Sequence, residues 1–464
     1  MTLLSHTLRT RVFAIPSLIV LALFASMCLY AARSGLEWRA VLEAEIASIE
    51  EDAFTKRSEW LLDLAEVEKG SNASPYAAQP MSLPFAAVRR LDPLADFSFS
   101  RQSLQPRSTT VNGWRNATSL WQGHELEAPT SLAQGRIDLS LCVIVLWPLL
   151  LLILGFGALN SDREAGRLEL LMVHGASPLR LVVFRVGIPA LCTWLILSGV
   201  ATVAAVSVPD SGRMGSFFSW WWVASLYGLG WTALVMAVAS TTRSFVVEGV
   251  SSLVLWSLLV LVLPSLSQGF AHAVKAPPSQ VAYLSRARAA QAEAKRNLDS
   301  RVSAFLSGHL DAADGDDEVP NYYRAAYLAN LEVRQTTEEI RREYARSRRE
   351  QSNIMRWAAL VAPVSGIFAE LQRITGTTPD AALDYEIQTA RFLNHLHDAI
   401  GPAVVAKSRL SLAQANTLTP FELKPVSQPV HGFGWLGWFV LCAVAAWATF
   451  KNTRVPESLA LRGE

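Results

Sequence analysis

Six long apolar runs constrain this chain more than any other feature of its sequence. A helix needs about 20 mainly apolar residues to cross the roughly 30 Å hydrocarbon core of a bilayer. Hydrophobic residues make up 51% of the 464 positions and charged residues only 17%, which is too apolar for an ordinary soluble chain. The sequence therefore predicts an all-α membrane protein with six transmembrane helices, at 12–32, 137–159, 180–207, 217–240, 246–266 and 432–450.

The first run needs separate consideration, because an N-terminal apolar stretch can also be a signal peptide. It lacks a clear small-x-small cleavage site and is long enough to span the membrane, so we expect a retained helix. With the helices placed, the chain divides into a first span at 1–32, an insertion at 33–136, spans two to five at 137–266, a helical segment at 267–431, and a last span with its tail at 432–464.

Positive residues in the loops set the expected orientation, because Arg and Lys in short loops stay on the cytoplasmic side. They gather on one side of the six spans, at Arg9, Arg11, Arg163, Arg167, Arg180, Arg243, Lys451 and Arg454. Both termini are then cytoplasmic, and the two long segments are extracytoplasmic. Aromatic residues at the outer ends of the spans agree with a membrane-interface belt there, at Trp220, Trp221, Trp222, Trp435 and Trp438.

The second long segment predicts an antiparallel extracytoplasmic helical hairpin. Strong helix formers fill 278–309 and 322–352, and the sequence DAADGDDEVPN between them has the composition of a turn. This acidic turn lacks the ligand spacing of an EF-hand calcium loop. The first long segment predicts a helix to about Lys69 and then a loop rich in Pro, Ser and Asn.

After the hairpin, the apolar stretch 357–369 is too short to span and contains Pro363, so we expect it to lie at the outer interface of the membrane. A further helix then begins at Thr378, a capping residue followed by a first-turn proline. His395 and His397 in this helix form an H-x-H pair, but residues two apart on a helix point to different faces. We therefore expect no metal site there.

Catalytic motifs are missing from the chain. None of its seven lysines follows a glycine, so it has no Walker A loop and cannot be its own P-loop ATPase. His124 and Glu125 lack the second histidine of a zinc peptidase motif, and no G-x-S-x-G of a serine hydrolase is present. We expect no catalytic residue, metal or cofactor on this chain, and its net charge of +1 gives no basic face for nucleic acid.

The segment 160–178, between spans two and three, is short, charged and amphipathic, and it includes the sequence DREAGRLELLMVHGASP. Helix formers continue from Asp162 to about Val173, and one face is apolar, at Leu168, Leu171 and Met172. Such a helix lies along the membrane, where it either gives a soluble partner a surface for pushing on two spans or merely joins them. Periodicity alone leaves both alternatives open.

The same stretch resembles the coupling region of ABC-2-type transporter permeases, in which an acidic residue and the pattern E-x-G-x-L-x-L-L precede a turn with Ser and Pro. The matching positions are Glu164, Gly166, Leu168, Leu170, Leu171, Ser177 and Pro178. Six spans and cytoplasmic termini are also expected of that family. The two long insertions, and the sequence VAPVSGIFAELQRITGTT at 361–378, resemble a bacterial subgroup of these permeases with large extracytoplasmic domains.

The resemblance implies the permease subunit of an ABC transporter in the bacterial inner membrane, with export as the expected direction. Such a subunit pairs with a second permease, as a homodimer or with a related paralogue. It also binds a dimer of separate cytoplasmic ATPase subunits, which hold ATP and magnesium. The segment 160–178 would be the coupling helix, and its candidate coupling residues are Asp162, Arg163, Glu164, Gly166, Arg167, Glu169 and His174.

The same architecture allows a second function. An ABC-type membrane machine that transports nothing would relay ATPase motion through the spans to the extracytoplasmic domain, and so to an envelope protein. A continuous cavity between the permease subunits would favour transport, whereas a sealed, Leu-rich interface between them would favour relay. The spans show no ring of charges that would mark an ion path, so the sequence names no substrate.

Two charged residues lie inside predicted spans near their cytoplasmic ends. Arg185 follows Arg180 by five residues in the third span, and Glu248 follows Arg243 by five residues in the fifth. Because both lie at a similar depth, they are candidates for an ion pair between these spans. The alternative is that each side chain reaches separately to the interface.

Overall fold

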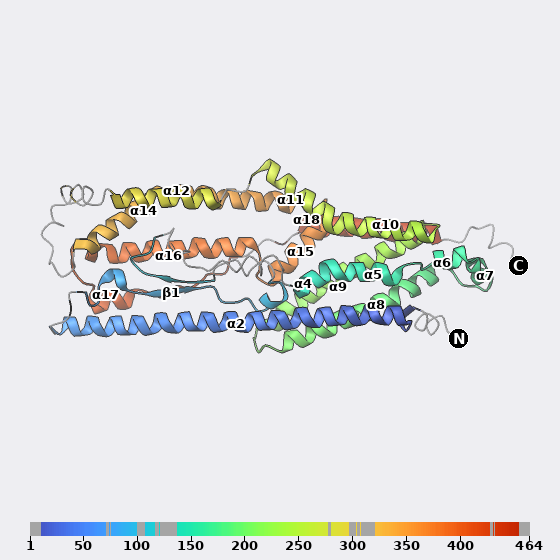
Figure 1. Ribbon diagram of the computed structural model, residues 1–464, viewed down its shortest axis with the longest axis horizontal. Coiled ribbons are helices and arrows are strands. Elements are labelled where there is room, and N and C mark those ends of the chain that lie inside the picture. Colours follow the sequence, from blue (N-terminus) through green and yellow to red (C-terminus); the bar gives the residue numbers. More distant parts are fainter. Residues whose placement is uncertain are drawn as a thin grey trace.

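The computed structural model describes residues 11–70, 74, 76–99, 107–116, 120, 137–276, 280–296, 303, 307, 321–426, 430 and 432–453. These residues form an elongated, mostly helical molecule with two regions (Figure 1). One region is a bundle of helices long and apolar enough to cross a membrane. The other region, which we call the distal domain, extends beyond one end of that bundle (Figure 1).

All six predicted spans are confirmed by helices within the described residues. They are α2 (Ile15–Glu68), α4 to α6 (Leu139–Glu164), α8 (Pro178–Val206), α9 (Arg213–Thr241), α10 to α11 (Phe245–Val274) and α18 (Gly432–Thr453). The largest difference from the sequence-based limits is in α2. Its 54 residues extend for about 80 Å at the usual rise of about 1.5 Å per residue, so one helix is both the first span and a part of the distal domain.

Two of the spans contain a single π-helical turn. Span two consists of α4 (Leu139–Leu141), the π-turn η4 (Cys142–Leu146), α5 (Trp147–Gly155) and α6 (Asn160–Glu164). Span five consists of α10 (Phe245–Ser257), the π-turn η5 (Leu258–Val262) and α11 (Leu263–Val274). A proline follows each π-turn, Pro148 in span two and Pro264 in span five. Because proline lacks an N–H and its ring crowds the preceding turn, the helix widens there.

Helix α9 is the centre of the bundle and packs against α5, α8, α18 and the short helix α15 (Pro363–Ile374). Four buried aromatic side chains lie in this region, Trp220, Tyr227, Trp231 and Trp438. The Tyr227 hydroxyl donates to the Ile144 carbonyl at 2.9 Å. The interface-belt interpretation is therefore corrected for Trp220 and Trp438, which belong to the core, whereas Trp222 is 60% exposed.

The distal domain adds a small sheet to the outer half of α2. Its further elements are η2 (Pro80–Ser82), β1 (Phe85–Val88), η3 (Ala95–Phe97), β2 (Ser108–Val111), α12 (Gln280–Arg296), α14 (Asn321–Ala358), α16 (Pro379–Val405) and α17 (Leu412–Thr417). Strands β1 and β2 are antiparallel, with Phe85 paired to Val111 and Val88 to Ser108. Sequence analysis predicted only a loop here, because two strands of four residues are too short for a visible alternation.

A second hydrophobic core lies inside the distal domain. It joins α2, β1, α14 and α16 through Trp60, Leu64, Phe85, Tyr327 and Ile400. The polar ends of its large side chains have partners, since Trp60 Nε1 donates to the Gln79 carbonyl at 3.0 Å and the Tyr327 hydroxyl to the His397 carbonyl at 3.2 Å. The outer half of α2 is thus packed into the domain along its length.

The predicted helical hairpin is confirmed, because α12 and α14 lie side by side (Figure 1). The acidic turn at 311–320 lies outside the described residues, so the absence of a calcium site there stays a prediction. Helix α15 is too short to span, as expected, and packs against α9, α18 and α4. Helix α16 begins as predicted, with Thr378 Oγ1 accepting the Ala381 N–H at 3.2 Å.

The two histidines of α16 point to different faces, as their spacing predicted. His395 is exposed, whereas His397 is buried with its Nε2 at 3.2 Å from the Gly113 carbonyl. Burial lowers the pKa of His397 to about 4, so its imidazole is neutral at pH 7. In the part of the chain that the structure describes, no cluster of His, Cys, Asp or Glu is arranged for a metal ion.

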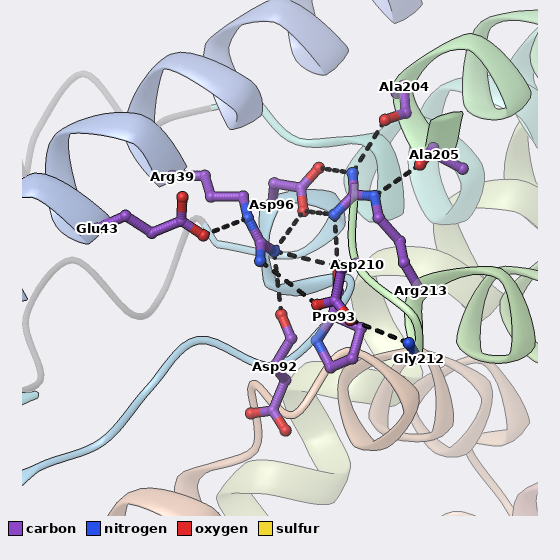
Figure 2. A network of polar contacts seen from close by, with 10 residues as sticks. All are labelled: Arg39, Glu43, Asp92, Pro93, Asp96, Ala204, Ala205, Asp210, Gly212 and Arg213. Atoms are coloured by element: carbon purple, nitrogen blue, oxygen red, sulfur yellow. Dashed lines mark hydrogen bonds and ion pairs between the residues drawn. The ribbon is translucent and has the colours of Figure 1, made fainter. Parts of the chain in front are cut away.

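A buried ion pair between Arg213 and Asp96 joins the bundle to the distal domain (Figure 2). Arg213, at the start of α9, is 1% exposed and Asp96, in η3, is 2% exposed. Nη1 and Nη2 of Arg213 each lie 2.7 Å from one Asp96 oxygen. The same guanidinium donates to the carbonyls of Ala204 and Ala205 at the end of α8. This bidentate pair fixes both distance and orientation.

Helix α2 enters the same network through Arg39. Its Nη1 donates to the carbonyls of Asp92 and Pro93 at 3.1 and 3.0 Å, and lies 3.4 Å from Asp96 Oδ1 (Figure 2). The helix passes so close to η3 that a Cβ at residue 35 would overlap the Asp96 carbonyl, so Gly35 is required there. We call Arg39, Asp96 and Arg213 the junction network.

We expect Asp96→Asn to destabilise the protein strongly, because it leaves the Arg213 guanidinium buried without its counter-charge. Removing one partner of a buried ion pair costs about 3–5 kcal/mol. Thermal unfolding of the purified protein in detergent measures the effect. Asp52→Asn is the matched control, since Asp52 forms an exposed pair with Lys56 and such pairs contribute at most about 1 kcal/mol. Equal melting temperatures for the two variants would contradict this role of the junction network.

Candidate functional site

The segment between spans two and three contains two short helices, α6 and α7 (Arg167–Val173). They lie at the end of the bundle away from the distal domain, where α2 begins and α18 ends (Figure 1). Sequence analysis predicted one helix from Asp162 to about Val173. The structure corrects this, because Gly166 has a φ of +67°, a left-handed conformation that interrupts the helix and that glycine adopts without a steric penalty.

Asp162 binds two arginines from different elements. It is 7% exposed, its Oδ2 lies 2.5 Å from Arg185 Nη2, and its Oδ1 lies 2.9 Å from Arg167 Nε. Arg185 also donates to the Ala158 carbonyl at 2.7 Å. Because Arg185 belongs to α8 and Arg167 begins α7, this one carboxylate connects the third span to both short helices.

Glu248, in the first turn of α10, is buried against α6. Its Oε1 accepts the N–H of Gly157 at 3.1 Å, and its Oε2 accepts the side-chain amide of Asn160 at 2.9 Å. The same amide donates to Thr242 Oγ1 at 2.8 Å, in the connection between α9 and α10. Buried polar groups are stable only when they are hydrogen-bonded, so these contacts hold the fifth span to α6.

Two further arginines complete the arrangement. Arg11, just before α2, donates to the carbonyls of Phe156 and Gly157 at 2.6 Å each, which lack partners within the helix at the end of α5. Arg163 donates to the Asn160 side chain and to the Thr242 carbonyl. We define the α6 polar cluster as Arg11, Asn160, Asp162, Arg163, Arg185 and Glu248. Its contacts involve the beginning or end of spans one, two, three and five.

Helix α7 buries one face and exposes the other. Leu168 is buried and Leu171 and Met172 pack against the bundle core, as their spacing predicted. The opposite side is exposed and consists of Glu169, Leu170, Val173 and His174, which we call the α7 face. Val173 is 83% exposed and Leu170 61% exposed. These residues form one surface, because 169 with 173 and 170 with 174 are one helical turn apart.

Four of the seven predicted coupling residues bind inside the protein. Asp162 and Arg163 belong to the α6 polar cluster, and Arg167 pairs with Asp162 while staying 63% exposed at its side chain. Glu164 is exposed, but its Oε1 accepts the Phe245 N–H at 2.7 Å and so caps α10. These residues hold the segment in place.

The remaining three predicted residues form the break and the surface. Gly166 separates α6 from α7, and Glu169 and His174 belong to the α7 face. Sequence reasoning missed Asn160, although a polar residue at the end of an apolar run was a usable signal. It also missed the exposed apolar side chain of Val173, for which the periodicity gave no signal.

The predicted ion pair between Arg185 and Glu248 is replaced by separate contacts. Arg185 pairs with Asp162, and Glu248 accepts hydrogen bonds from Gly157 and Asn160. Both residues nevertheless belong to the same polar cluster. The sequence did not reveal that α6 supplies a partner to each of them.

The charged groups of this site bind one another and backbone carbonyls, and one exposed helix face is attached to them. The sequence model of the family described as ABC-2 family transporter protein matches residues 5–451, nearly the whole chain. The chain belongs to the ABC-2 transporter family. A search of curated proteins finds no match to it.

Membership in the ABC-2 family, together with the six apolar helices, makes this chain a multi-pass membrane protein and a permease subunit of an ABC transporter. Permeases of the ABC-2 family are transport components without catalytic activity of their own, and the family implies an ATPase partner. The two short helices and the α6 polar cluster lie inside the region matched by the family.

A double-mutant cycle distinguishes the observed ion pair from the one suggested by sequence. Asp162→Asn and Arg185→Gln should each lower thermal stability by about 1.5–3 kcal/mol, the usual contribution of a hydrogen bond to a charged group. Because the two residues share one contact, the double variant should lose much less than the sum.

The matched cycle uses Arg185→Gln with Glu248→Gln. These residues have different partners, so their losses should be closer to additive. Strong coupling in this second cycle, with additivity in the first, would contradict the arrangement described above.

Proposed function

We propose that this ABC-2 permease is driven by a dimer of separate ATPase subunits that docks on the α7 face, and that it exports its substrate. The observation that carries the proposal is the chain of ion pairs from Arg167 of α7 through Asp162 to Arg185 of the third span. A displacement of α7 therefore acts directly on the bundle. The α6 polar cluster extends the same displacement to spans one and five.

The chemistry of the α7 face supports a protein contact. It combines the exposed apolar side chains of Leu170 and Val173 with the charge of Glu169 and the imidazole of His174. Apolar side chains rimmed by polar ones are typical of protein-binding surfaces. ATP and magnesium would bind to the ATPase, in keeping with the missing Walker A loop in this sequence.

A second permease subunit follows from the ATPase dimer. An ATPase dimer presents two docking sites, whereas this chain contributes one α7 face. The complete transporter therefore holds two permeases, either two copies of this chain or this chain with a paralogue. We place the assembly in the bacterial inner membrane, with α6, α7 and both termini in the cytoplasm and the distal domain outside.

One observation favours the alternative function of mechanical relay. Helix α2 begins shortly after Arg11 of the α6 polar cluster. It continues without a break past the junction network to Trp60 in the hydrophobic core of the distal domain. Motion at the ATPase end would reach an envelope partner of the distal domain through this helix. Transport remains our main proposal, because the family model that matches nearly the whole chain is one of transporter proteins.

Charge changes on the α7 face test the coupling role. We expect Glu169→Arg combined with Val173→Glu to reduce copurification of the ATPase, and its ATP hydrolysis in the complex, by at least about tenfold, the effect of losing a binding residue worth about 1.4 kcal/mol or more. Membrane insertion and thermal stability should stay at the parent level, because neither side chain is buried.

Phe54→Glu is the matched control, since Phe54 is 74% exposed on the distal half of α2. It introduces the same kind of charge on an exposed helix far from α7. Normal ATPase binding by the α7 variant, or equal loss in the control, would contradict docking on the α7 face.

The orientation is tested by labelling intact cells with a membrane-impermeant maleimide. In a variant with Ala at Cys28, Cys142, Cys192 and Cys442, we expect a new cysteine at Asp52 to be labelled at once. A new cysteine at Glu169 should react only after the cells are permeabilised. The reverse pattern would show that the distal domain is cytoplasmic and would exclude export by the proposed route.

A further inference from the structure

A cavity of about 500 Å³ lies where spans two and five meet α14, α15 and α16. These elements converge at the middle of the molecule, between the bundle and the distal domain (Figure 1). Its volume is within the range of about 300–1,000 Å³ that is typical of small-molecule sites. Because its walls come from spans and from helices of the distal domain, the cavity lies at the boundary between these two regions.

The lining has an apolar part and a cationic part. The apolar part comes from both spans and from the adjoining helices, through Ile144, Val145, Val260, Pro264, Met355 and Phe368. The cationic part comes from Arg348 and Arg356 of α14. These two arginines are eight residues apart, so they lie on the same side of the helix.

Neither arginine forms a direct ion pair in the part of the chain that the structure describes. Among the described residues, no ion pair or hydrogen bond joins either guanidinium to a neighbour, and Arg356 Nε is buried without any hydrogen-bond partner. A buried donor without a partner is unfavourable by about 1–3 kcal/mol, and by more when it is charged. Both arginines are half-buried, and an anion in the cavity would supply their guanidinium groups with a partner.

The nearby acidic groups do not fully neutralise the two arginines. Asp380 also lines the cavity, with its Oδ2 accepting the Ser352 hydroxyl at 2.7 Å, but this one carboxylate offsets the charge of only one guanidinium. Glu386 acts on Arg348 through space, yet burial raises the pKa of Glu386 to about 7, so this carboxyl is incompletely ionised near neutral pH. His272 lies on the lining too. The positive charge of the two arginines thus exceeds the negative charge of the nearby carboxyl groups.

We propose that this cavity binds an amphiphile with one anionic headgroup, held by Arg348 and Arg356, and one apolar chain, held between spans two and five. The inference rests on the proposed transport function, for which it names the substrate class. A small polar anion would leave the apolar wall in contact with water, and an uncharged apolar molecule would leave both guanidiniums unpaired. Only a molecule with both properties matches both parts of the lining.

Binding is tested on the permease alone, in nanodiscs of neutral phosphatidylcholine, with a dansyl-labelled medium-chain fatty acid and its methyl ester. Energy transfer from tryptophan reports binding. We expect the acid to bind at least about tenfold more tightly than the ester, because only the acid forms charge-assisted hydrogen bonds. Arg348→Gln with Arg356→Gln should remove this difference, while Ala369→Phe, which fills the cavity, should weaken both ligands.

Arg342→Gln is the matched control, because Arg342 lies on the same helix, is exposed, and pairs with Glu338 outside this cavity. It should leave the preference for the acid unchanged. Competition by a fatty acid or by a lysophosphatidate then ranks carboxylate against phosphate headgroups. Equal binding of acid and ester, or a preference that survives the double variant, would show partition into lipid only and overturn the site. The assay contains no ATPase, so failed coupling at the α7 face does not affect its outcome.

Discussion

The buried ion pair between Arg213 and Asp96 is the interaction on which the two-part shape of the molecule depends. It lies where α8 ends and α9 begins, so the carbonyls at the end of α8 need donors at this point. Arg213 supplies them, but its charge is then buried and needs the Asp96 carboxylate from the other region. The spans and the distal domain therefore complete each other's hydrogen bonds at this junction.

Helix α2 connects this junction to the ATPase-facing end that we propose. Arg11 binds the carbonyls that end α5 at one extreme of the bundle, and Arg39 binds the η3 backbone at the other. Both attachments are made by guanidinium groups on backbone carbonyls, whose positions depend little on side-chain sequence. A continuous helix transmits displacement along its axis because every turn is hydrogen-bonded to the next. The two polar sites are thereby mechanically linked across the membrane-spanning region.

The spans, the hairpin and the start of α16 at Thr378 could be predicted because local composition decides them. The bundle interior could not, since Trp438 is buried against α9, and Trp220 against Phe97 of η3 and Ser140 of α4. A single sequence does not show which elements are neighbours. The same reason explains the site: the apolar side of α7 follows from the spacing of Leu168 and Leu171, whereas the partners of Arg185 and Glu248 depend on where α6 lies. The sheet was missed because its strands are short.

The ion pairs on the two sides of the junction between the bundle and the distal domain differ in their burial. The α2 and α8 side holds the buried network of Arg39, Asp96 and Arg213, whereas the α11 and α14 side is joined by the exposed ion pair between Lys275 and Glu350 at 2.8 Å. Exposed pairs contribute little stability, and a buried pair resists separation. The cavity that contains Arg348 and Arg356 is bordered by α11 and α14. In the export route that we propose, the cationic cavity therefore lies on the side of the junction that the exposed ion pair joins.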